Sequence, residues 1–300
     1  MFLEKNNMMW KIKVISRFIF SSCFGKMTNL ISDELFNKFM FFITFLKKPN
    51  FINPKTFNEY ICSFKYREEE LEKWKYTDKY QVRKYVKSIL GEEYLNKIIG
   101  VYDYYDNIDF LSLPPKFVLK TTHGSSYNIV VKDKNSFNKN KAAKYFKKWL
   151  STNYYYISRE KNYYLIKPRI ICESFISNTE GGLDEIKVFC FRGKVGFIQF
   201  ISFKNNKNFS NFFDKDWKFL EVRYRYPPNI KIQIPDNTKK IVKIAEKLAK
   251  PFEFVRVDLY NVDNKIIFSE LTFHPGGGLI PFNPKDYDYK FGKFFNEDKH

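Results

Sequence analysis

The stretch FVLKTTHGSSYNIVVK, residues 117–132, joins two apolar runs through a short polar loop, with a lysine at the end of each run. Two structures would account for it. The first is an ordinary hairpin, in which Gly124 supplies a permissive backbone for the turn. The second is a phosphate site, in which loop N–H groups and small hydroxyls surround an anion while Lys120 and Lys132 supply positive charge. Taken alone, the stretch favours the hairpin, because Gly-Ser turns are common.

A second group of candidate residues lies where FVRVDLY and KIIFSELTF flank NVDN, a pattern that predicts a hairpin. Arg256 and Asp258 share one face of the first strand, because side chains alternate along a strand. Glu270 and Thr272 share one face of the second strand in the same way. Two carboxylates on neighbouring strands suit a hard cation such as Mg²⁺, with phosphate oxygens and water completing its octahedron. The arginine beside them would neutralise charge on a phosphoryl group in transfer.

The register of this hairpin decides whether the two carboxylates meet. With a tight two-residue turn at 263–264, the residue opposite Asp258 is Ser269. One bulge is then required to bring Glu270 to that position. Without the bulge, the same charges are those of a solvated hairpin edge.

The surrounding segments predict an α+β protein with largely antiparallel strands. Residues 29–113 are expected to be mainly helical, with a capping box formed by Thr56 and Glu59. Pro114-Pro115 breaks this pattern, and strand-like runs follow. The further expected elements are a helix in NKNKAAKYFKKWL with Ala142, Phe146, Trp149 and Leu150 on one face, a strand in RIICESFI, a hairpin of EIKVFCF and VGFIQFIS around Arg192-Gly193-Lys194, and a helix in TKKIVKIAEKLAK with Ile241, Ile244, Ala245 and Leu248 on one side.

Composition indicates a folded protein with an anionic partner. Of the 300 residues, 44% are hydrophobic and 20% aromatic, far too many for a disordered chain. The formal net charge is +19, and residues 131–170 hold eleven basic residues against two acids. The four cysteines form no C-x-x-C pair and share no spacing with the histidines, which indicates neither a zinc site nor a disulfide framework and fits a cytoplasmic protein.

The stretch MWKIKVISRFIFSSCFGKM, residues 9–27, is apolar but too charged for a membrane span or a signal peptide, because Lys11, Lys13 and Arg17 interrupt it. Two placements remain open: a basic amphipathic helix on a membrane surface, or a helix packed on the body of the protein. The first would bring a cytoplasmic protein to the inner face of the membrane.

Several of these stretches together resemble a known family. FVLKTTHGSSYNIVVK, RIICESFI, EIKVFCFRGKV, FVRVDLY and FSELTFHPGGG follow the order and spacing of the ATP-grasp enzymes, and in detail those of the TupA-like group tied to teichuronopeptide and capsular polysaccharide synthesis. NPKTFNE, DKYQVRKYV, YYYISRE and IKPRI match the same group, so the resemblance runs from about residue 30 to the C-terminus. It reverses the preference at residues 117–132 in favour of the phosphate site.

The resemblance implies an ATP-grasp fold, with ATP held between two antiparallel sheets. The implied division is a mostly helical region at 1–113, a central subdomain with the phosphate loop at 114–176, and a C-terminal subdomain with the metal carboxylates at 177–300. The implied cofactor contacts are Lys120 on the phosphates, His123, Gly124, Ser125 and Ser126 in the closing loop, Lys132 near the nucleotide, Glu173, Ser174 and Phe175 at the adenine, and Lys187 on ribose or phosphate. The implied metal ligands are Asp258, Glu270 and Thr272, and the implied catalytic residues are Arg256 and Lys120.

Two positions depart from the pattern of the group. The group usually has glycine where Ser126 stands, and the serine would stiffen the loop. ATP-grasp enzymes commonly have asparagine where Thr272 stands, and a threonine hydroxyl can still bind magnesium or its water.

The chemistry that the resemblance implies is carboxylate activation. A carboxylate attacks the γ-phosphate of ATP to give an acyl phosphate and ADP, and an amine then displaces phosphate to form an amide. Arg159 and Arg169 are the candidates for holding an anionic acceptor through bidentate pairs. The expected substrates are a uronic acid of a capsular or cell-surface polysaccharide, or its nucleotide-sugar precursor, and an amino acid or small amine.

Three other functions remain open. A nucleic-acid-binding protein would account for the net charge of +19 and for twenty-one tyrosines that could stack on bases, and its binding would weaken steeply with salt and need no Mg-ATP. A glycosyltransferase of a polysaccharide locus is disfavoured by the lack of a D-x-D motif in a Rossmann-like setting. The third is an ATP-grasp fold that binds nucleotide without ligating anything.

Overall fold

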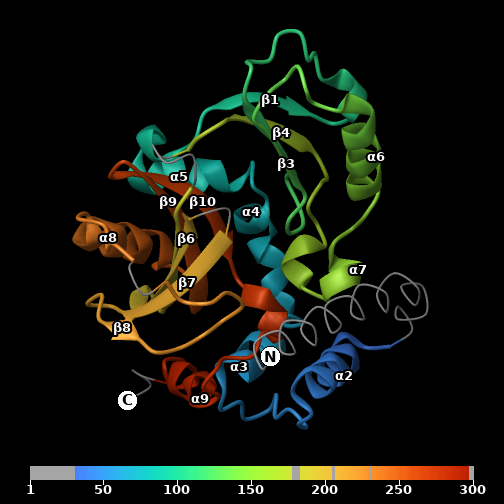
Figure 1. Cartoon of the computed structure of the whole chain (residues 1–300). Helices are drawn as coiled ribbons and strands as arrows, with labels where there is room; N and C mark the ends of the chain where they lie inside the picture. Colours follow the sequence, from blue (N-terminus) through green and yellow to red (C-terminus); the bar gives the residue numbers. More distant parts are fainter. Residues whose placement is uncertain (1–30, 178–182, 205–206, 230–231, 297–300) are drawn as a thin grey trace, which may run out of the picture.

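Two antiparallel sheets form the centre of the protein, which a computed structural model describes at residues 31–177, 183–204, 207–229 and 232–296. Within these residues, the first sheet has four strands in the order β1-β4-β2-β3, and the second has six in the order β10-β9-β5-β6-β7-β8. Figure 1 shows the four-stranded sheet at the top of the molecule and the six-stranded sheet below it. The predicted α+β class with two antiparallel sheets is confirmed.

The four-stranded sheet includes a strand from the N-terminal region. Its strands are β1 (Ile98–Tyr102), β2 (Phe117–Thr121), β3 (Asn128–Val131) and β4 (Ile170–Ser174). β1 pairs with β4 and was not among the predicted strands. The division at residues 113 and 176 stays a prediction, and the structure adds that Tyr105, Ile108 and Leu113 pack in the core of this sheet.

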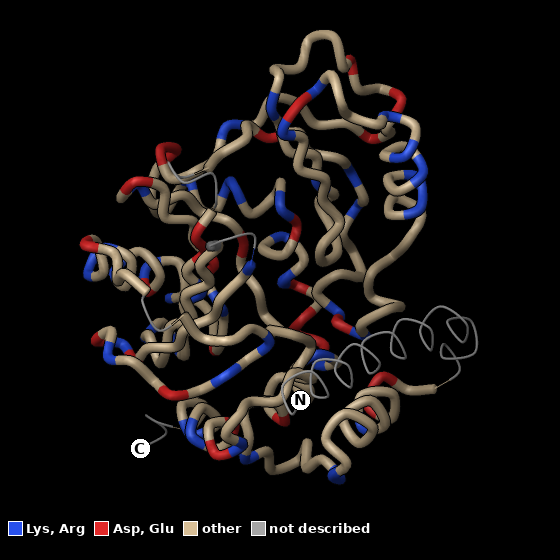
Figure 2. Tube along the Cα trace, in the orientation of Figure 1, with Lys and Arg blue, Asp and Glu red and all other residues tan. Residues whose placement is uncertain are grey.

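Helix α6 (Lys139–Leu150) covers this sheet with the apolar side that its sequence predicts. Ala142 and Phe146 are buried in the core of the sheet, and Trp149 and Leu150 pack against that core. Figure 2 shows a run of basic residues along the same helix, which belongs to the basic segment at 131–170.

The six-stranded sheet is covered on one face by helix α8 (Thr238–Ala249). Its strands are β5 (Glu185–Phe191), β6 (Lys194–Lys204), β7 (Lys207–Asp214), β8 (Phe219–Leu220), β9 (Phe254–Val262) and β10 (Lys265–Thr272). The predicted apolar side of α8 is confirmed, because its buried residues include Ile241, Ile244, Ala245 and Leu248. They pack in one cluster with Val188, Ile198 and Val257 of the sheet.

The other face of this sheet packs on aromatic side chains. Phe57 belongs to helix α3 (Phe57–Phe64) and is fully buried. Its ring centroid lies 5.6 Å from that of Phe254 in β9 and 5.9 Å from that of Phe189 in β5, both edge to face. Each such pair contributes about 0.5–1.5 kcal/mol beyond the burial of its area. These contacts anchor the N-terminal region to the six-stranded sheet.

The described chain contains ten further helices, most of them short. They are α2 (Asp33–Phe45), η2 (Glu68–Lys73), α4 (Trp74–Thr77), α5 (Val82–Leu90), η3 (Glu92–Tyr94), η4 (Tyr105–Asn107), α7 (Tyr155–Ser158), η5 (Lys161–Tyr163), η6 (Pro275–Gly278) and α9 (Asp286–Lys293). The capping box predicted before α3 is confirmed: Thr56 Oγ1 accepts from the Glu59 N–H at 3.2 Å, and Glu59 Oε2 accepts from the Thr56 N–H at 3.1 Å.

No helix within the described ranges is long and apolar enough to cross a bilayer. The stretch at residues 9–27, for which a membrane surface and a packed position were both left open, lies outside the described residues. Its placement stays a prediction.

Helix α9 contacts helix α3 through a half-buried carboxylate. Asp288 Oδ1 accepts a hydrogen bond from the Asn58 N–H of α3 at 2.9 Å. Burial raises the pKa of Asp288 from 3.8 to about 6, against the lowering effect of the hydrogen bonds from Asn58. Above pH 6 the ionised side chain is therefore less favourable in the folded protein than in the unfolded chain.

We expect Asp288→Asn to stabilise the protein by up to about 3 kcal/mol above pH 6. The gain should shrink as the pH falls through 6 and vanish below 3.8, where the carboxyl is protonated in both states. Thermal unfolding across this pH range measures it. The matched control is Asp286→Asn in the same turn of α9, an exposed position that should show no such dependence. An equal gain at every pH would contradict the explanation.

Candidate functional site

A cavity of about 640 Å³ lies between the two sheets, a volume typical of small-ligand sites. Side chains from both sheets line it. The four-stranded sheet and its loop contribute Lys120, Ser125, Ser126 and Glu173, and the six-stranded sheet contributes Lys187, Arg256, Glu270 and Thr272. The predicted phosphate loop at residues 123–126 therefore borders the same cavity as the hairpin of β9 and β10. This hairpin carries the predicted metal ligands and is called the metal hairpin below.

The hairpin of β9 and β10 contains the bulge that the metal site requires. The turn at 263–264 is tight, with φ of 50° and 63°. Beyond the turn the pairing shifts by one residue at Ser269, and Glu270 then lies opposite Asp258. The required bulge is confirmed, and the two carboxylates belong to directly paired residues.

Asp258 is held by two cations. The Arg256 guanidinium donates from Nε to Oδ1 and from Nη2 to Oδ2, each at 2.6 Å. Lys187 Nζ donates to Oδ2 at 2.7 Å and also lies 2.8 Å from Glu185 Oε2. The Asp258 side chain is fully buried, and an unpaired charge would be very unfavourable there. Lys187, predicted to contact ribose or phosphate, thus lines the cavity with its ammonium held by carboxylates.

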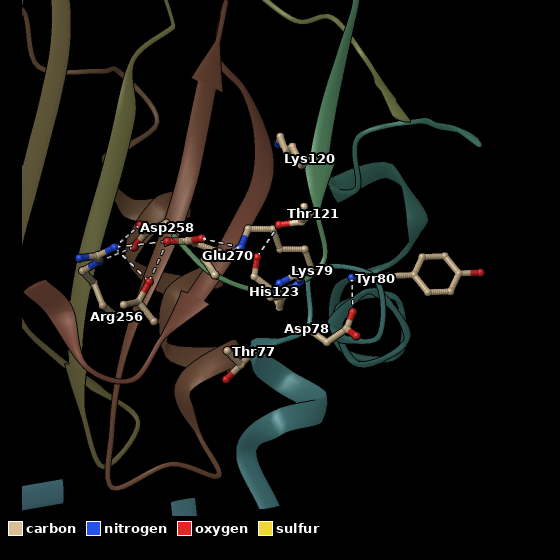
Figure 3. A network of polar contacts seen from close by, with 12 residues as sticks. Thr77, Asp78, Lys79, Tyr80, Lys120, Thr121, His123, Arg256, Asp258 and Glu270 are labelled. Atoms are coloured by element: carbon tan, nitrogen blue, oxygen red, sulfur yellow. Dashed lines mark hydrogen bonds and ion pairs between the residues drawn. The ribbon is translucent and has the colours of Figure 1, made fainter. Parts of the chain in front are cut away.

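Glu270 lies between cations from two parts of the chain (Figure 3). Its Oε1 lies 3.5 Å from Arg256 Nη2 and accepts a hydrogen bond from the Thr272 hydroxyl at 3.0 Å. Its Oε2 lies 3.9 Å from Lys79 Nζ. Burial alone would raise the pKa of Glu270, but the nearby lysines and Arg256 outweigh it and lower the pKa to about 2. This carboxylate is therefore ionised throughout the neutral range.

Three oxygen atoms of this cluster surround one nitrogen. Arg256 Nη2 lies 2.6 Å from Asp258 Oδ2 and 3.0 Å from Thr272 Oγ1. The same nitrogen lies 3.5 Å from Glu270 Oε1. Two carboxylates and a hydroxyl are hard donors, so the chemistry of these residues fits Mg²⁺. Glu270 and Thr272 line the cavity, whereas Asp258 is not among the described residues that do so. Among the described residues, no group of three or more His, Cys, Asp or Glu side chains could hold a metal ion, so phosphate oxygens and water would supply the other ligands.

The first strand of the phosphate hairpin directs Lys120 into the cavity. The Lys120 Nζ donates to Glu173 Oε2 at 2.8 Å, and Arg83 Nη1 lies 4.0 Å from Glu173 Oε1. Burial alone would lower the pKa of Lys120, but Glu173 outweighs it and raises the pKa, so the lysine stays cationic. Lys120 and Glu173 were both predicted, and both line the cavity as an ion pair.

Lys79 is a further cation of the site and was not among the predicted site residues. It lies between α4 and α5, and its Nζ donates to the Gly124 carbonyl at 2.8 Å. Because the same Nζ approaches Glu270, Lys79 connects the phosphate loop to the metal hairpin (Figure 3). Burial lowers the pKa of Lys79. Lys79 lies in the stretch DKYQVRKYV, which matches the family, but a lysine in such a polar segment is normally exposed.

His123 fixes the phosphate loop on the side away from the cavity. The imidazole is buried, and its Nε2 lies 2.9 Å from the Trp149 carbonyl and 3.0 Å from the Thr152 carbonyl at the end of α6. Ser125 and Ser126 line the cavity, whereas His123 is not among the described residues that do so. The structure therefore gives His123 a positioning role.

Two residues of this loop have a left-handed backbone, Gly124 with φ of 77° and Ser126 with φ of 63°. A β-carbon at Gly124 would lie 2.8 Å from the Tyr127 ring, so this position requires glycine. Ser126 stands where the resembled group has glycine, and glycine adopts this backbone conformation with less strain. Ser126 therefore adopts a backbone conformation that glycine favours.

Three other predicted cofactor contacts lie away from the cavity wall. Lys132 is exposed just after β3. Ser174 donates its N–H to the Lys97 carbonyl at 2.9 Å, and Phe175 follows it in the chain. None of the three is among the described residues that line the cavity. Their contacts with ATP stay predictions.

The two arginines predicted to hold an anionic acceptor are paired elsewhere. Arg159 Nη1 lies 3.2 Å from Asp33 Oδ1. Arg169 Nη2 lies 3.4 Å from Asp78 Oδ2, and its guanidinium lies over the Tyr80 ring at 4.8 Å. Neither arginine is among the described residues that line the cavity. The structure gives both arginines a structural role, and their contact with substrate stays a prediction.

Residues 59–296 match the model of one family, TupA-like ATPgrasp. No curated protein matches the chain.

Solved structures are similar in part. D-alanine–D-alanine ligase from Bacillus anthracis has 17% identity and a TM-score of 0.40, with 72% of this chain and 59% of that chain covered. D-alanine–D-alanine ligase from Helicobacter pylori has 14% identity and a TM-score of 0.39, with 75% and 61% covered. ATP-grasp ligase PsnB complexed with minimal precursor has 8% identity and a TM-score of 0.39, with 71% and 59% covered. This chain thus spans about three fifths of their length.

The family match extends over most of the 300 residues. It takes in both sheets, the phosphate loop and the hairpin that carries Asp258 and Glu270. The resemblance seen in the separate stretches of sequence is thereby confirmed, and the chain belongs to the TupA-like ATP-grasp family.

Proposed function

We propose that this protein is a ligase that uses Mg-ATP to join a carboxylate to an amine. The family supports this proposal, and so does one observation: Lys79, Lys120 and Arg256 line the same cavity as the carboxylate of Glu270. Such a group of cations and carboxylates suits a triphosphate with bound Mg²⁺, whose charge is spread over several oxygens.

In this proposal the residues act by position and charge. Asp258, Glu270 and Thr272 would hold Mg²⁺, which when bound neutralises phosphate charge and orients the terminal phosphoryl group. Lys79 and Lys120 bind phosphate oxygens from the side of the phosphate loop, where the loop N–H groups and serine hydroxyls also lie.

Arg256 stabilises the phosphoryl group during its transfer to the substrate carboxylate. Its guanidinium is fixed by two short hydrogen bonds to Asp258, so it needs little rearrangement when charge develops on the phosphoryl oxygens. The amine then displaces phosphate from the acyl phosphate to form the amide.

For the substrates we propose a uronic acid of a capsular or cell-surface polysaccharide, or its nucleotide-sugar precursor, and an amino acid or small amine. The association of the family and the net charge of +19 support an anionic substrate. Arg225 lines the cavity and is a better candidate for binding it than Arg159 or Arg169. We place the reaction in the cytoplasm, where ATP is available.

The purified protein is expected to release ADP from Mg-ATP only when a suitable carboxylate and a nucleophile are both present. Hydroxylamine can replace the unidentified amine, since it converts acyl phosphates into hydroxamates. A panel of free and nucleotide-linked uronates would be tested, with omission of Mg²⁺ as the control. If no member gives ADP and hydroxamate, the ligase proposal fails. Salt-sensitive binding of RNA or DNA without Mg-ATP would then favour the nucleic-acid alternative.

A further inference from the structure

Glu160 presents another carboxylate to the cavity, from the turn between α7 and η5. Its side chain is 10% exposed, and its Oε2 lies 3.4 Å from His274 Nδ1. The His274 side chain is fully buried, and its Nε2 lies 3.1 Å from Glu70 Oε2. Glu70 is in turn paired with Lys73. This chain of buried groups holds the Glu160 side chain in place.

Glu160 differs from the other three glutamates that line the cavity. Each of those is paired with a lysine or an arginine, in the pairs Glu173–Lys120 at 2.8 Å, Glu185–Lys187 at 2.8 Å and Glu270–Arg256 at 3.5 Å. Among the described residues, the one ionic partner of Glu160 is the imidazole of His274, which it contacts through Oε2. Its second oxygen, Oε1, can therefore accept a hydrogen bond from a charged donor on a ligand.

Gly277 leaves the space in front of this oxygen open. Its backbone is left-handed, with φ of 62°, and a β-carbon there would lie 3.7 Å from Glu160 Oε1 and 3.8 Å from Lys65 Nζ. A longer side chain would cover the oxygen. The Lys65 ammonium donates to Asn37 Oδ1 at 2.6 Å. The rings of Tyr154 and Tyr163 also line the cavity, with centroids 4.8 Å apart. A carboxylate together with aromatic rings suits an ammonium group, which is attracted by the charge and by the ring faces.

Tyr163 links this group of residues to the phosphate end of the cavity. Its N–H donates to the Glu160 carbonyl at 3.1 Å. Burial raises the pKa of Tyr163 well above its ordinary value, and Glu160 raises it further. Glu270 also raises this pKa, and Arg256 lowers it. Tyr163 and Glu160 line the same cavity as Arg256 and Glu270, so the Glu160 carboxylate and the hairpin of β9 and β10 border one space.

We propose that Glu160 binds the ammonium group of the amine substrate and thereby selects a cationic amine as the second substrate. This inference rests on the ligase function proposed above. Amines are protonated in neutral water, and a largely buried carboxylate is a favourable partner for the cation. The bound ammonium must pass one proton to this carboxylate or to water before its nitrogen can attack the acyl carbon and displace phosphate. A neutral nucleophile gains less from this carboxylate, because it offers only an uncharged donor.

Hydroxylamine provides the test, because it is largely uncharged at neutral pH and still attacks an acyl phosphate. In Glu160→Gln, we expect the KM for the amine substrate to rise about 10- to 100-fold, while hydroxamate formation stays unchanged. Glu160→Asp keeps the charge and should retain part of the amine binding. The matched control is Glu68→Gln, because Glu68 is 78% exposed and paired with the neighbouring Lys161, and it should change neither reaction.

The outcomes separate the two proposals. If a folded Glu160→Gln protein loses both reactions equally, or keeps the wild-type KM for the amine, Glu160 does not select the amine and the ligase function still stands. If wild-type protein forms no hydroxamate with any carboxylate, the ligase function fails and this inference fails with it. Thermal unfolding of each variant shows whether it is folded.

Discussion

Lys120→Met is expected to abolish the stabilisation of the protein by Mg²⁺ and a non-hydrolysable ATP analogue. In the wild type, a ligand at a hundredfold excess over Kd stabilises the folded state by about 2.7 kcal/mol. Each kcal/mol raises Tm by roughly 2–4 °C in a chain somewhat smaller than this one. Methionine fills the space of the lysine stem but brings no charge to the phosphates. It also leaves Glu173 without its nearest cation, so this carboxylate would repel the nucleotide.

The measurement is the difference in Tm with and without the nucleotide, because loss of the ion pair with Glu173 also lowers the Tm of the free protein. Lys132→Met is the matched control, since this lysine belongs to the same hairpin but is exposed. It should keep the full stabilisation. A full stabilisation of Lys120→Met at saturating nucleotide would instead exclude the phosphate role and leave the stretch at 117–132 as an ordinary hairpin.

The second large effect is expected at the buried pair of Arg256 and Asp258. Arg256→Met should lower the free energy of unfolding by about 3–5 kcal/mol, because Asp258 stays buried with one cation fewer. Asp258→Leu should cost a similar amount, because it leaves the guanidinium buried without its bidentate partner. The double substitution should cost less than the sum of the two, since it removes both charges together.

Urea unfolding of the four proteins measures this coupling. The matched control is the exposed pair Glu34–Lys38 of α2, in which both side chains are more than 40% exposed. There a cycle of Glu34→Leu and Lys38→Met should give a coupling of about 0.5 kcal/mol or less. Additive effects at the buried pair would show that its two charges do not stabilise each other.

The sequence predicted best those features that periodicity along one element determines. Alternation along a strand placed Arg256 and Asp258 on one face, and helical spacing identified the buried side of α8. The bulge at Ser269 was predicted as a requirement, because a two-residue turn fixes the register on both strands. One extra residue then brings Glu270 opposite Asp258.

Pairing between distant charges could not be predicted in this way. Arg159 and Arg169 were assigned to an anionic substrate because few acids lie near them in the sequence. Their partners are Asp33 and Asp78, which precede the basic segment by many residues. A local count of charges contains no information on such tertiary contacts. Lys79 was missed for the same reason, since its partners come from the loop and from β10.

Strand β1 was missed because its sequence carries no alternation. All five residues of Ile98–Tyr102 are half-buried, so neither face is distinctly polar. The strand also contains Gly100, a residue that is unfavourable in a strand. Pairing with β4 decides its conformation, and that pairing joins parts of the chain that are distant in sequence.

The contacts between early and late segments determine when the site can form during synthesis on the ribosome. Phe57 packs on Phe254, Asn58 binds Asp288, and Lys79 faces Glu270. In each case the first residue leaves the ribosome long before its partner. Until β9, β10 and α9 have emerged, the aromatic side of α3 has no surface to cover it and is prone to aggregate. The site between the two sheets can therefore form only after β9, β10 and α9 have left the ribosome.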